Sequence, residues 1–354
     1  MIADVRASLA NERTDWPMIA AVANRHAITP ALWAAINRKQ LADLVPTDVS
    51  AYLELLYNTN RQRNRLVREQ TLEVVRGLNH HGIDPILMKS VLTLFEVGCD
   101  EGASIMSDVD LLVAQRELPR AISAMRSLGY DLLFDPPAYA HASTFHRPMS
   151  LATVDLHCDI GPQRALLTPA AASTASEPIS RSDVAMSGLA VSHRVLLLVM
   201  NFGVFERDYL AGHIPMKGLQ DLAGLCHRRG REIDWEYVFR TTSDNDIGAQ
   251  AAAFFHMASE LMGIPVPIYP RQGGRAQRYL NQCALLLAYP TFGRVARAYA
   301  QVAWPFDRIR MDYRHHCGTR GTPLAAARVR HVIEVLQRRN PLRAWRAMVS
   351  RQDA

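Results

Sequence analysis

The chain has 354 residues, of which 49% are hydrophobic and 21% charged, and its net charge is +6. This composition is ordinary for a folded globular protein and excludes a chain that is disordered throughout. The length allows two or three domains, and no apolar run approaches the roughly 18 residues of a membrane-spanning helix.

The N-terminal segment and the cysteines favour a cytoplasmic location. Residues 1–16 lack the apolar stretch of a secretory signal. The five cysteines are scattered, odd in number and never spaced as Cys-x-x-Cys. This pattern argues against a disulfide scaffold or a cysteine zinc site and fits a reducing compartment.

Positive charge is concentrated at the C-terminal end. From residue 271 onward there are 16 Arg, no Lys and four acids, a net charge of +12, which leaves −6 for the first 270 residues. Such a region can attract nucleic acid or another anionic partner. The whole chain has only three lysines, so Arg is its usual surface cation. We therefore favour a solvated helical surface, and nucleic acid is a possible but less favoured partner.

The first 80 residues are predicted to form a helical N-terminal region. Apolar residues recur there with the spacing of one helix face, at Val67, Thr71, Val74, Val75 and Leu78. Prolines at positions 30 and 46 separate the earlier segments.

Residues 81–170 carry a different pattern, in which short apolar runs predict strands over 83–88, 108–113, 130–134 and 149–160. A helix is expected between the second and third strands, over 118–128, with Gly129 as its left-handed C-terminal residue. The Pro-rich stretch 135–148 is expected to be a loop.

After a Ser/Thr/Ala/Pro-rich stretch over 168–183, helical spacing returns from 185 to 354, where the Arg-rich end lies. The expected fold class is therefore α+β, with a small mixed-sheet core over 81–170 embedded between an N-terminal and a C-terminal helical region.

Two aspartates share one face of a predicted strand. Asp108 and Asp110 are two residues apart, so both carboxylates project to the same side, while Val109 and Leu111 point into the opposite layer. Like charges crowded in this way repel each other, and a divalent cation relieves the repulsion.

A third carboxylate, Asp155, lies in another predicted strand and shares its face with His157. If the two strands are neighbours, the three carboxylates converge and can hold Mg²⁺ against a triphosphate. His157 is interpreted as a hydrogen-bond partner of a carboxylate or as a core histidine, because no regular spacing of zinc ligands surrounds it.

The strand that ends at Met88 is followed by Lys89 and Ser90. A lysine and backbone N–H groups at a strand end can contact phosphates. In a chain whose other cations are nearly all Arg, a lysine indicates that this position requires an ammonium group. The alternative is an ordinary surface lysine at the end of a strand.

The run from Met88 to Val113, followed by a helix ending in Leu-Gly-Tyr and then by Val-Asp-Leu-His, resembles an uncharacterised nucleotidyltransferase family often found beside polysaccharide and ribosomal-peptide biosynthesis genes. That family's pattern is Lys-Gly, about 18 residues, Arg-x-x-Ser-Asp-Ile/Val-Asp-Leu-Leu-Val, the helix, and Asp/Glu-Leu-His. The resemblance covers roughly residues 15–265 and implies a core with the DNA polymerase β-like nucleotidyltransferase fold.

The resemblance implies a role for each matching residue. Asp108, Asp110 and Asp155 would bind Mg²⁺ (or Mn²⁺) and carry catalysis, with Asp155 as the base. Contacts to a nucleoside triphosphate would come from Lys89, Ser90 and Ser107. The implied reaction moves a nucleotidyl group from the nucleotide to a hydroxyl of a small molecule, a sugar or a peptide.

The sequence departs from the family pattern at two of these places. Ser90 stands where the family has Gly, which can adopt a positive φ and approach phosphate closely. Ser104 stands where the family usually has Arg, so a cation near the expected metal site is missing. These departures motivate an alternative function, that of a catalytically weakened binding or accessory protein in a biosynthetic pathway.

Overall fold

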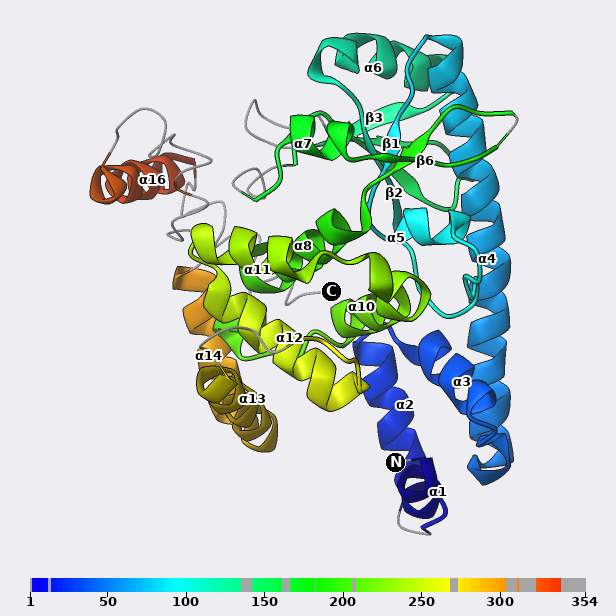
Figure 1. Ribbon diagram of the computed structural model, residues 1–354, viewed down its shortest axis with the longest axis vertical. Helices are drawn as coiled ribbons and strands as arrows, with labels where there is room; N and C mark the ends of the chain where they lie inside the picture. The colour runs from blue at the N-terminus through cyan, green and yellow to red at the C-terminus, as the bar shows by residue number, and fades with distance from the viewer. Residues whose placement is uncertain are drawn as a thin grey trace, which may run out of the picture.

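A seven-stranded mixed sheet lies at one end of the molecule, with helices on its sides and a larger group of helices beside it (Figure 1). The computed structural model describes residues 2–11, 14–134, 142–160, 166–181, 183–205, 208–267, 273–303, 311 and 323–338. The arrangement confirms the predicted α+β class, with a sheet set between N-terminal and C-terminal helices.

The N-terminal helices end in one that is much longer than the others. Their bounds are α1 (Ile2–Leu9), α2 (Trp16–Arg25), α3 (Thr29–Arg38), the 3-10 turn η1 (Ala42–Leu44) and α4 (Thr47–His80). Helix α4 runs along the whole right-hand side of the molecule in Figure 1. The predicted apolar stripe is its buried face, since Val67, Val74, Val75 and Leu78 are wholly buried.

The sheet is built from short strands in the order β3-β4-β5-β2-β1-β7-β6. Their bounds are β1 (Ile86–Leu87), β2 (Asp108–Leu112), β3 (Asp131–Phe134), β4 (Ala142–His146), β5 (Thr153–His157), β6 (Glu177–Pro178) and β7 (Ser187–Gly188). Two neighbouring pairs, β2 with β5 and β1 with β7, are parallel, and the other pairs are antiparallel.

Short helices connect these strands, namely α5 (Lys89–Leu92), η2 (Thr93–Phe95), η3 (Gln115–Glu117), α6 (Leu118–Ser127) and α7 (Pro169–Thr174). The predicted helix over 118–128 is confirmed as α6. Gly129 follows it with φ +79°, in the left-handed conformation expected at this position.

Three strands lie where the sequence predicts none. β4 falls in the expected loop 135–148, because Ser143 and Phe145 alternate as buried residues between β3 and β5. β6 and β7 lie beyond residue 170 and contain two residues each, too few for any periodicity. The sheet therefore continues past the boundary that the sequence suggests.

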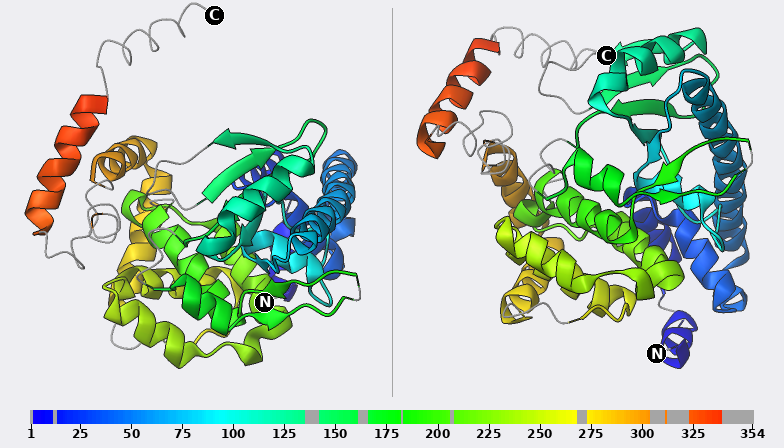
Figure 2. Two further views of the ribbon diagram at one scale, coloured as in Figure 1. Left: turned by 90° about the horizontal axis from the view of Figure 1, so that it is seen from above. Right: turned by 45° about the horizontal axis from the view of Figure 1, so that its top comes forward.

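Helices fill the rest of the described chain. They are α8 (Val191–Met200), a π-helical turn η5 (Asn201–Phe205), α9 (Asp208–Ala211), α10 (Met216–Arg229), η6 (Gly230–Glu232), α11 (Trp235–Asp244), α12 (Gly248–Met262), α13 (Gly273–Ala288), α14 (Pro290–Ala303) and α16 (Leu324–Arg338). Figure 2 shows α16 set apart from the other helices. Within the described ranges, no helix combines the length and apolarity that crossing a membrane requires.

Separate hydrophobic cores support the sheet and the C-terminal helices. The sheet core lies against α4 and α6 and includes Val109 and Leu111, whereas the helical core is centred on α8, α10 and α12. A buried ion cluster joins the two parts: Glu96, after η2, accepts hydrogen bonds from Arg194 of α8 and Arg228 of α10. Because breaking a buried ion pair costs several kcal/mol, this cluster fixes the helices against the sheet.

Candidate active site

The site is built on the parallel pair β2 and β5 at the centre of the sheet. The register places Asp110 directly beside Asp155, and side chains in register on neighbouring strands project to the same face. Val109 and Leu111 point the other way and are wholly buried in the sheet core. The buried face thus fixes the direction in which the carboxylates point.

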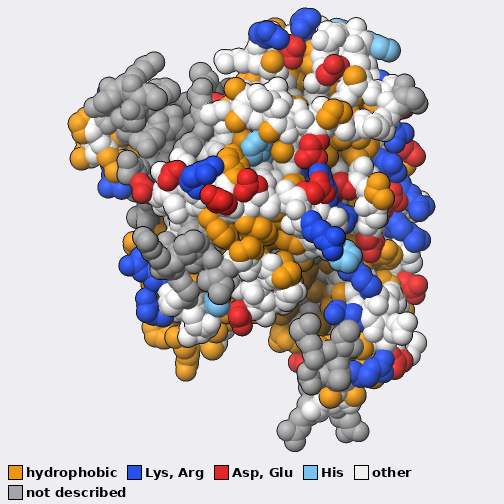
Figure 3. Space-filling view, viewed as in Figure 1, with side chains coloured by type: hydrophobic (Ala, Val, Ile, Leu, Met, Phe, Trp, Pro, Cys, Tyr) orange, Lys and Arg blue, Asp and Glu red, His pale blue; other side chains and the backbone are white. Residues whose placement is uncertain are grey.

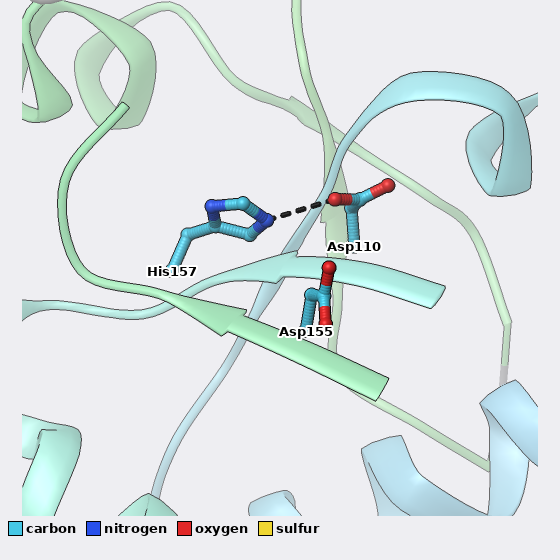
Figure 4. Close-up of side chains that lie close together, drawn as sticks. All are labelled: Asp110, Asp155 and His157. Atoms are coloured by element: carbon cyan, nitrogen blue, oxygen red, sulfur yellow. Dashed lines mark hydrogen bonds and ion pairs between the residues drawn. The ribbon is translucent and has the colours of Figure 1, made fainter. Parts of the chain in front are cut away.

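Asp110, Asp155 and His157 bring their ligand atoms within 4.8 Å of one another (Figure 4). Asp110 is only 1% exposed and His157 only 2%. The Nε2 atom of His157 lies 2.8 Å from Oδ1 of Asp110. Against an ionised carboxylate this nitrogen must carry the proton, so His157 donates the hydrogen bond and holds Asp110 in place.

Lys89 contacts the same carboxylate oxygen. Its Nζ atom lies 2.6 Å from Oδ1 of Asp110, which therefore accepts hydrogen bonds from both an ammonium and an imidazole. Lys89 has φ +51°, a left-handed conformation that costs a non-glycine residue about 1–2 kcal/mol. Backbone strain of this kind persists where surrounding contacts enforce it, and functional sites are the commonest such places.

The positive φ falls one residue earlier than the family pattern suggests. Ser90 lies in α5 and is not among the residues with positive φ. The serine that replaces the family glycine is therefore not strained, and the strain is carried by Lys89 instead. The Ser90 hydroxyl makes no hydrogen bond to any described residue, so it is free to meet a ligand.

Asp108 and Ser107 lie at the beginning of β2. The hydroxyl of Ser107 donates a hydrogen bond of 2.8 Å to Oδ1 of Asp108. Asp108 does not belong to the group of Asp110, Asp155 and His157, whose ligand atoms lie within 4.8 Å of one another. Its charge nevertheless interacts with the charges of Asp110 and Lys89. The structure thus brings Asp110 and Asp155 closely together and leaves Asp108 at the edge of the site.

Electrostatics set these groups apart from ordinary aspartates and lysines. Burial acts to raise the pKa of Asp110, but the charge of Lys89 and the hydrogen bond from His157 lower it to about 2. Burial raises the pKa of Asp108, and the charge of Asp110 adds to this effect. Burial acts to lower the pKa of Lys89, yet the neighbouring Asp110 raises it overall. Lys89 therefore stays charged.

The site fits a divalent cation. Oδ1 of Asp155 is buried and has no hydrogen-bond partner among the described residues, and such an atom is costly unless something binds it. The carboxylates of Asp108, Asp110 and Asp155 and the ammonium of Lys89 have a summed formal charge of −2. Carboxylate oxygens are hard ligands, which a divalent cation such as Mg²⁺ prefers. The residues that could hold the ion are Asp110 and Asp155, with Asp108 beside them.

A second polar cluster lies on the loop that leads into β2. Ser104, which replaces the family arginine, contacts Lys217 of α10 through a 2.9 Å hydrogen bond from Nζ to Oγ. Lys217 is also paired with Asp221, at 2.7 Å. A cation is thus present beside position 104 and comes from a helix 113 residues later in the chain.

The fold and site define an α+β protein with a candidate cation site on two parallel strands beside a lysine. A family model described as an uncharacterised nucleotidyltransferase matches residues 12–263, more than half of the chain. The chain belongs to this uncharacterised nucleotidyltransferase family, which confirms the resemblance found in the sequence. No match was found among the curated proteins or the solved structures.

Sequence reasoning assigned no role to Lys217 or its partner Asp221. A signal was nevertheless present, because Lys217 is one of only three lysines in the chain and stands four residues before an acid on one helix face. Two other histidines precede Asp155 closely in the sequence: His146 is exposed and outside the group, and His141 lies outside the described residues.

Proposed function

We propose that this protein transfers a nucleotidyl group from a nucleoside triphosphate to a hydroxyl of a small molecule, a sugar or a peptide, with release of pyrophosphate and with Mg²⁺ or Mn²⁺ as the cofactor. The observation that carries the proposal is the pairing of Asp110 with Asp155 on adjacent parallel strands, with one buried carboxylate oxygen left without a partner. Membership of a nucleotidyltransferase family supports the class of reaction.

Asp110 and Asp155 would hold the metal together with Asp108, and the bound ion would neutralise the triphosphate and stabilise negative charge on the oxygens of the attacked phosphate. Asp155 would accept the proton from the acceptor hydroxyl, since its Oδ1 is not engaged by another described residue. His157 would keep Asp110 oriented through the hydrogen bond at Oδ1.

Lys89 would exchange partners when the triphosphate binds. Its ammonium now neutralises Asp110, and a metal at the carboxylates would take over that task. The side chain is 30% exposed, so it has room to reach phosphate oxygens. Ser90 and Ser107 would add hydroxyl contacts at the same edge of the site, Ser107 while it also holds Asp108.

The test combines calorimetry with a transfer assay. The protein, in MnCl₂ or MgCl₂, is titrated with each of the four nucleoside triphosphates. It is then incubated with labelled triphosphates and panels of sugars, peptides and small alcohols as acceptors. We expect heat with at least one triphosphate, and transfer that is lost in Asp110→Asn and Asp155→Asn. The matched control is Asp131→Asn, an exposed aspartate on β3 of the same sheet. Transfer that persists in either site variant would reject the assigned roles.

A second candidate function is that of a binding protein without transferase activity. The observation that favours it is that the protein's own groups already engage Asp110, since Lys89 neutralises its charge and His157 donates a hydrogen bond to it. This alternative expects no heat with any triphosphate in either metal. It also expects Lys89→Met to create metal binding where the unaltered protein has none, because the substitution removes the competing cation.

A further inference from the structure

A cleft of about 520 Å³ lies between α4 and the chain segment 94–101, which follows α5. None of the residues of the candidate active site lines it. Basic and acidic side chains are interleaved along the edge of the molecule that α4 forms (Figure 3). The cleft is therefore separate from the candidate active site, and its mixed charges require a separate explanation.

Two arginines of α4 line the cleft, each over an aromatic ring. The guanidinium carbon of Arg61 lies 5.8 Å from the ring centre of Tyr57, and that of Arg68 lies 5.6 Å from the ring centre of Phe95. These stacking contacts hold the planar guanidinium groups in place and leave their N–H edges available.

Among the described residues, neither arginine has an acceptor for every N–H donor. Arg61 has no acidic partner among the described residues. Arg68 has one long contact to Glu101, at 3.4 Å, and its Nε atom is buried without a hydrogen-bond partner. A buried charged donor without a partner is costly, so an acceptor bound in the cleft would remove a penalty that the free protein bears.

The three acidic side chains of the cleft already have partners: Glu96 pairs with Arg194 and Arg228, Asp100 accepts from the hydroxyl of Tyr57, and Glu101 pairs with Arg65 and, at 3.4 Å, with Arg68. None of them accepts a hydrogen bond from the Nε atom of Arg68. The lining itself holds two arginines and three carboxylates. With the three arginines outside the lining that pair with these carboxylates, five arginines stand against three carboxylates, and the formal charge of the whole group is +2.

We propose that this cleft binds a small molecule that carries a phosphate group, with Arg61 and Arg68 donating to the phosphate oxygens. A phosphate monoester carries a charge of about −1.5 to −2 at neutral pH, opposite in sign to the formal charge of this group of arginines and carboxylates as a whole. Guanidinium groups suit this ligand because their paired N–H donors fit two oxygens at once. The proposal does not depend on the transferase function, because the cleft and the carboxylates share no residue.

The other polar groups of the cleft are suited to binding and not to chemistry. Burial and the hydrogen bond to Asp100 raise the pKa of Tyr57 to about 12, so its hydroxyl remains a neutral donor. Burial raises the pKa of Cys99 to about 11, so its thiol is not a nucleophile at neutral pH.

The test is isothermal titration of the full chain with inorganic phosphate at fixed ionic strength. We expect saturable binding at one site, weakened at least about tenfold by Arg61→Gln, since losing one charge-assisted hydrogen bond costs about 1.5–3 kcal/mol. Arg61→Gln/Arg68→Gln is expected to abolish the binding. The control is Arg76→Gln, which removes a positive charge from the same helix about 22 Å from Arg61 and about 12 Å from Arg68 along the helix axis.

Three results would overturn the proposal. They are the absence of saturable phosphate binding, an equal loss in Arg76→Gln, and a loss caused by Asp110→Asn, which would place the phosphate at the carboxylate site. Arg61→Gln alone keeps the test decisive if the double variant does not fold, because Arg61 is exposed, has no ion-pair partner among the described residues and loses only its contact with the ring of Tyr57.

Discussion

Asp110→Asn should destabilise the protein by an amount that follows from the environment of this carboxylate. The contacts with Lys89 and His157 lower its pKa from the ordinary 3.8 to about 2. One pKa unit corresponds to about 1.4 kcal/mol, so the folded state favours the charged form by roughly 2 to 3 kcal/mol. Asparagine keeps the shape and removes the charge, and we expect that energy to be lost at pH 7.

The sign of the pH dependence gives an independent check. The folded-state pKa of Asp110 lies below the unfolded value, so its contribution is complete above about pH 4 and is lost as the pH falls towards 2. Urea unfolding of both proteins between pH 7 and pH 3 measures this difference. The stability gap between them should narrow over the acidic end of that range.

Two further variants separate the ion pair from a general effect of substitution. Asp131→Asn, on the exposed strand β3, should change stability by less than about 0.5 kcal/mol. Lys89→Met and Asp110→Asn combined should cost clearly less than the sum of the two single changes, because each removes the same interaction. Additive effects, or a loss below about 1 kcal/mol for Asp110→Asn at pH 7, would refute the reasoning.

Three other changes test the site and its supports. Mn²⁺ at 100 times its dissociation constant should stabilise the unaltered protein by about 2.7 kcal/mol in thermal unfolding, and should leave Asp155→Asn unchanged. Gly102→Ala should cost about 1–3 kcal/mol in urea unfolding, because the new Cβ would lie 2.3 Å from the ring of Tyr57; an unchanged midpoint would contradict this packing. Glu96→Gln should cost about 3–5 kcal/mol, since Arg194 and Arg228 lose their shared carboxylate in a buried place, and a cost below about 1 kcal/mol would mean that the cluster is not structural.

The alternation of side chains along a strand predicts the part of the site that lies within one strand. Asp108 and Asp110 project to one face because side chains alternate along a strand, and β2 covers the predicted run almost completely. The pairing of Asp110 with Asp155 could be stated only as a condition, because strand neighbours 45 residues apart leave no trace in local periodicity. Family resemblance supplied what periodicity could not.

Other features have no signal in a single sequence. β6 and β7 contain two residues each, and the residues of β4 lie in a Pro-rich stretch that resembles a loop. The contacts of Glu96 with Arg194 and Arg228 span 98 and 132 residues. Such contacts depend on how whole helices dock, which is decided by the shapes of the two hydrophobic cores.

Position 104 illustrates why a departure from a family pattern is weak evidence against function. Read along the chain, Ser104 removes a cation, but in space Lys217 places its ammonium 2.9 Å from the serine hydroxyl. Asp221 accepts hydrogen bonds from both residues. An arginine at 104 would face Lys217 at the same acid, where two cations would repel each other. Serine at 104 and lysine at 217 therefore form a compatible pair that retains one positive charge beside the loop leading to Asp108.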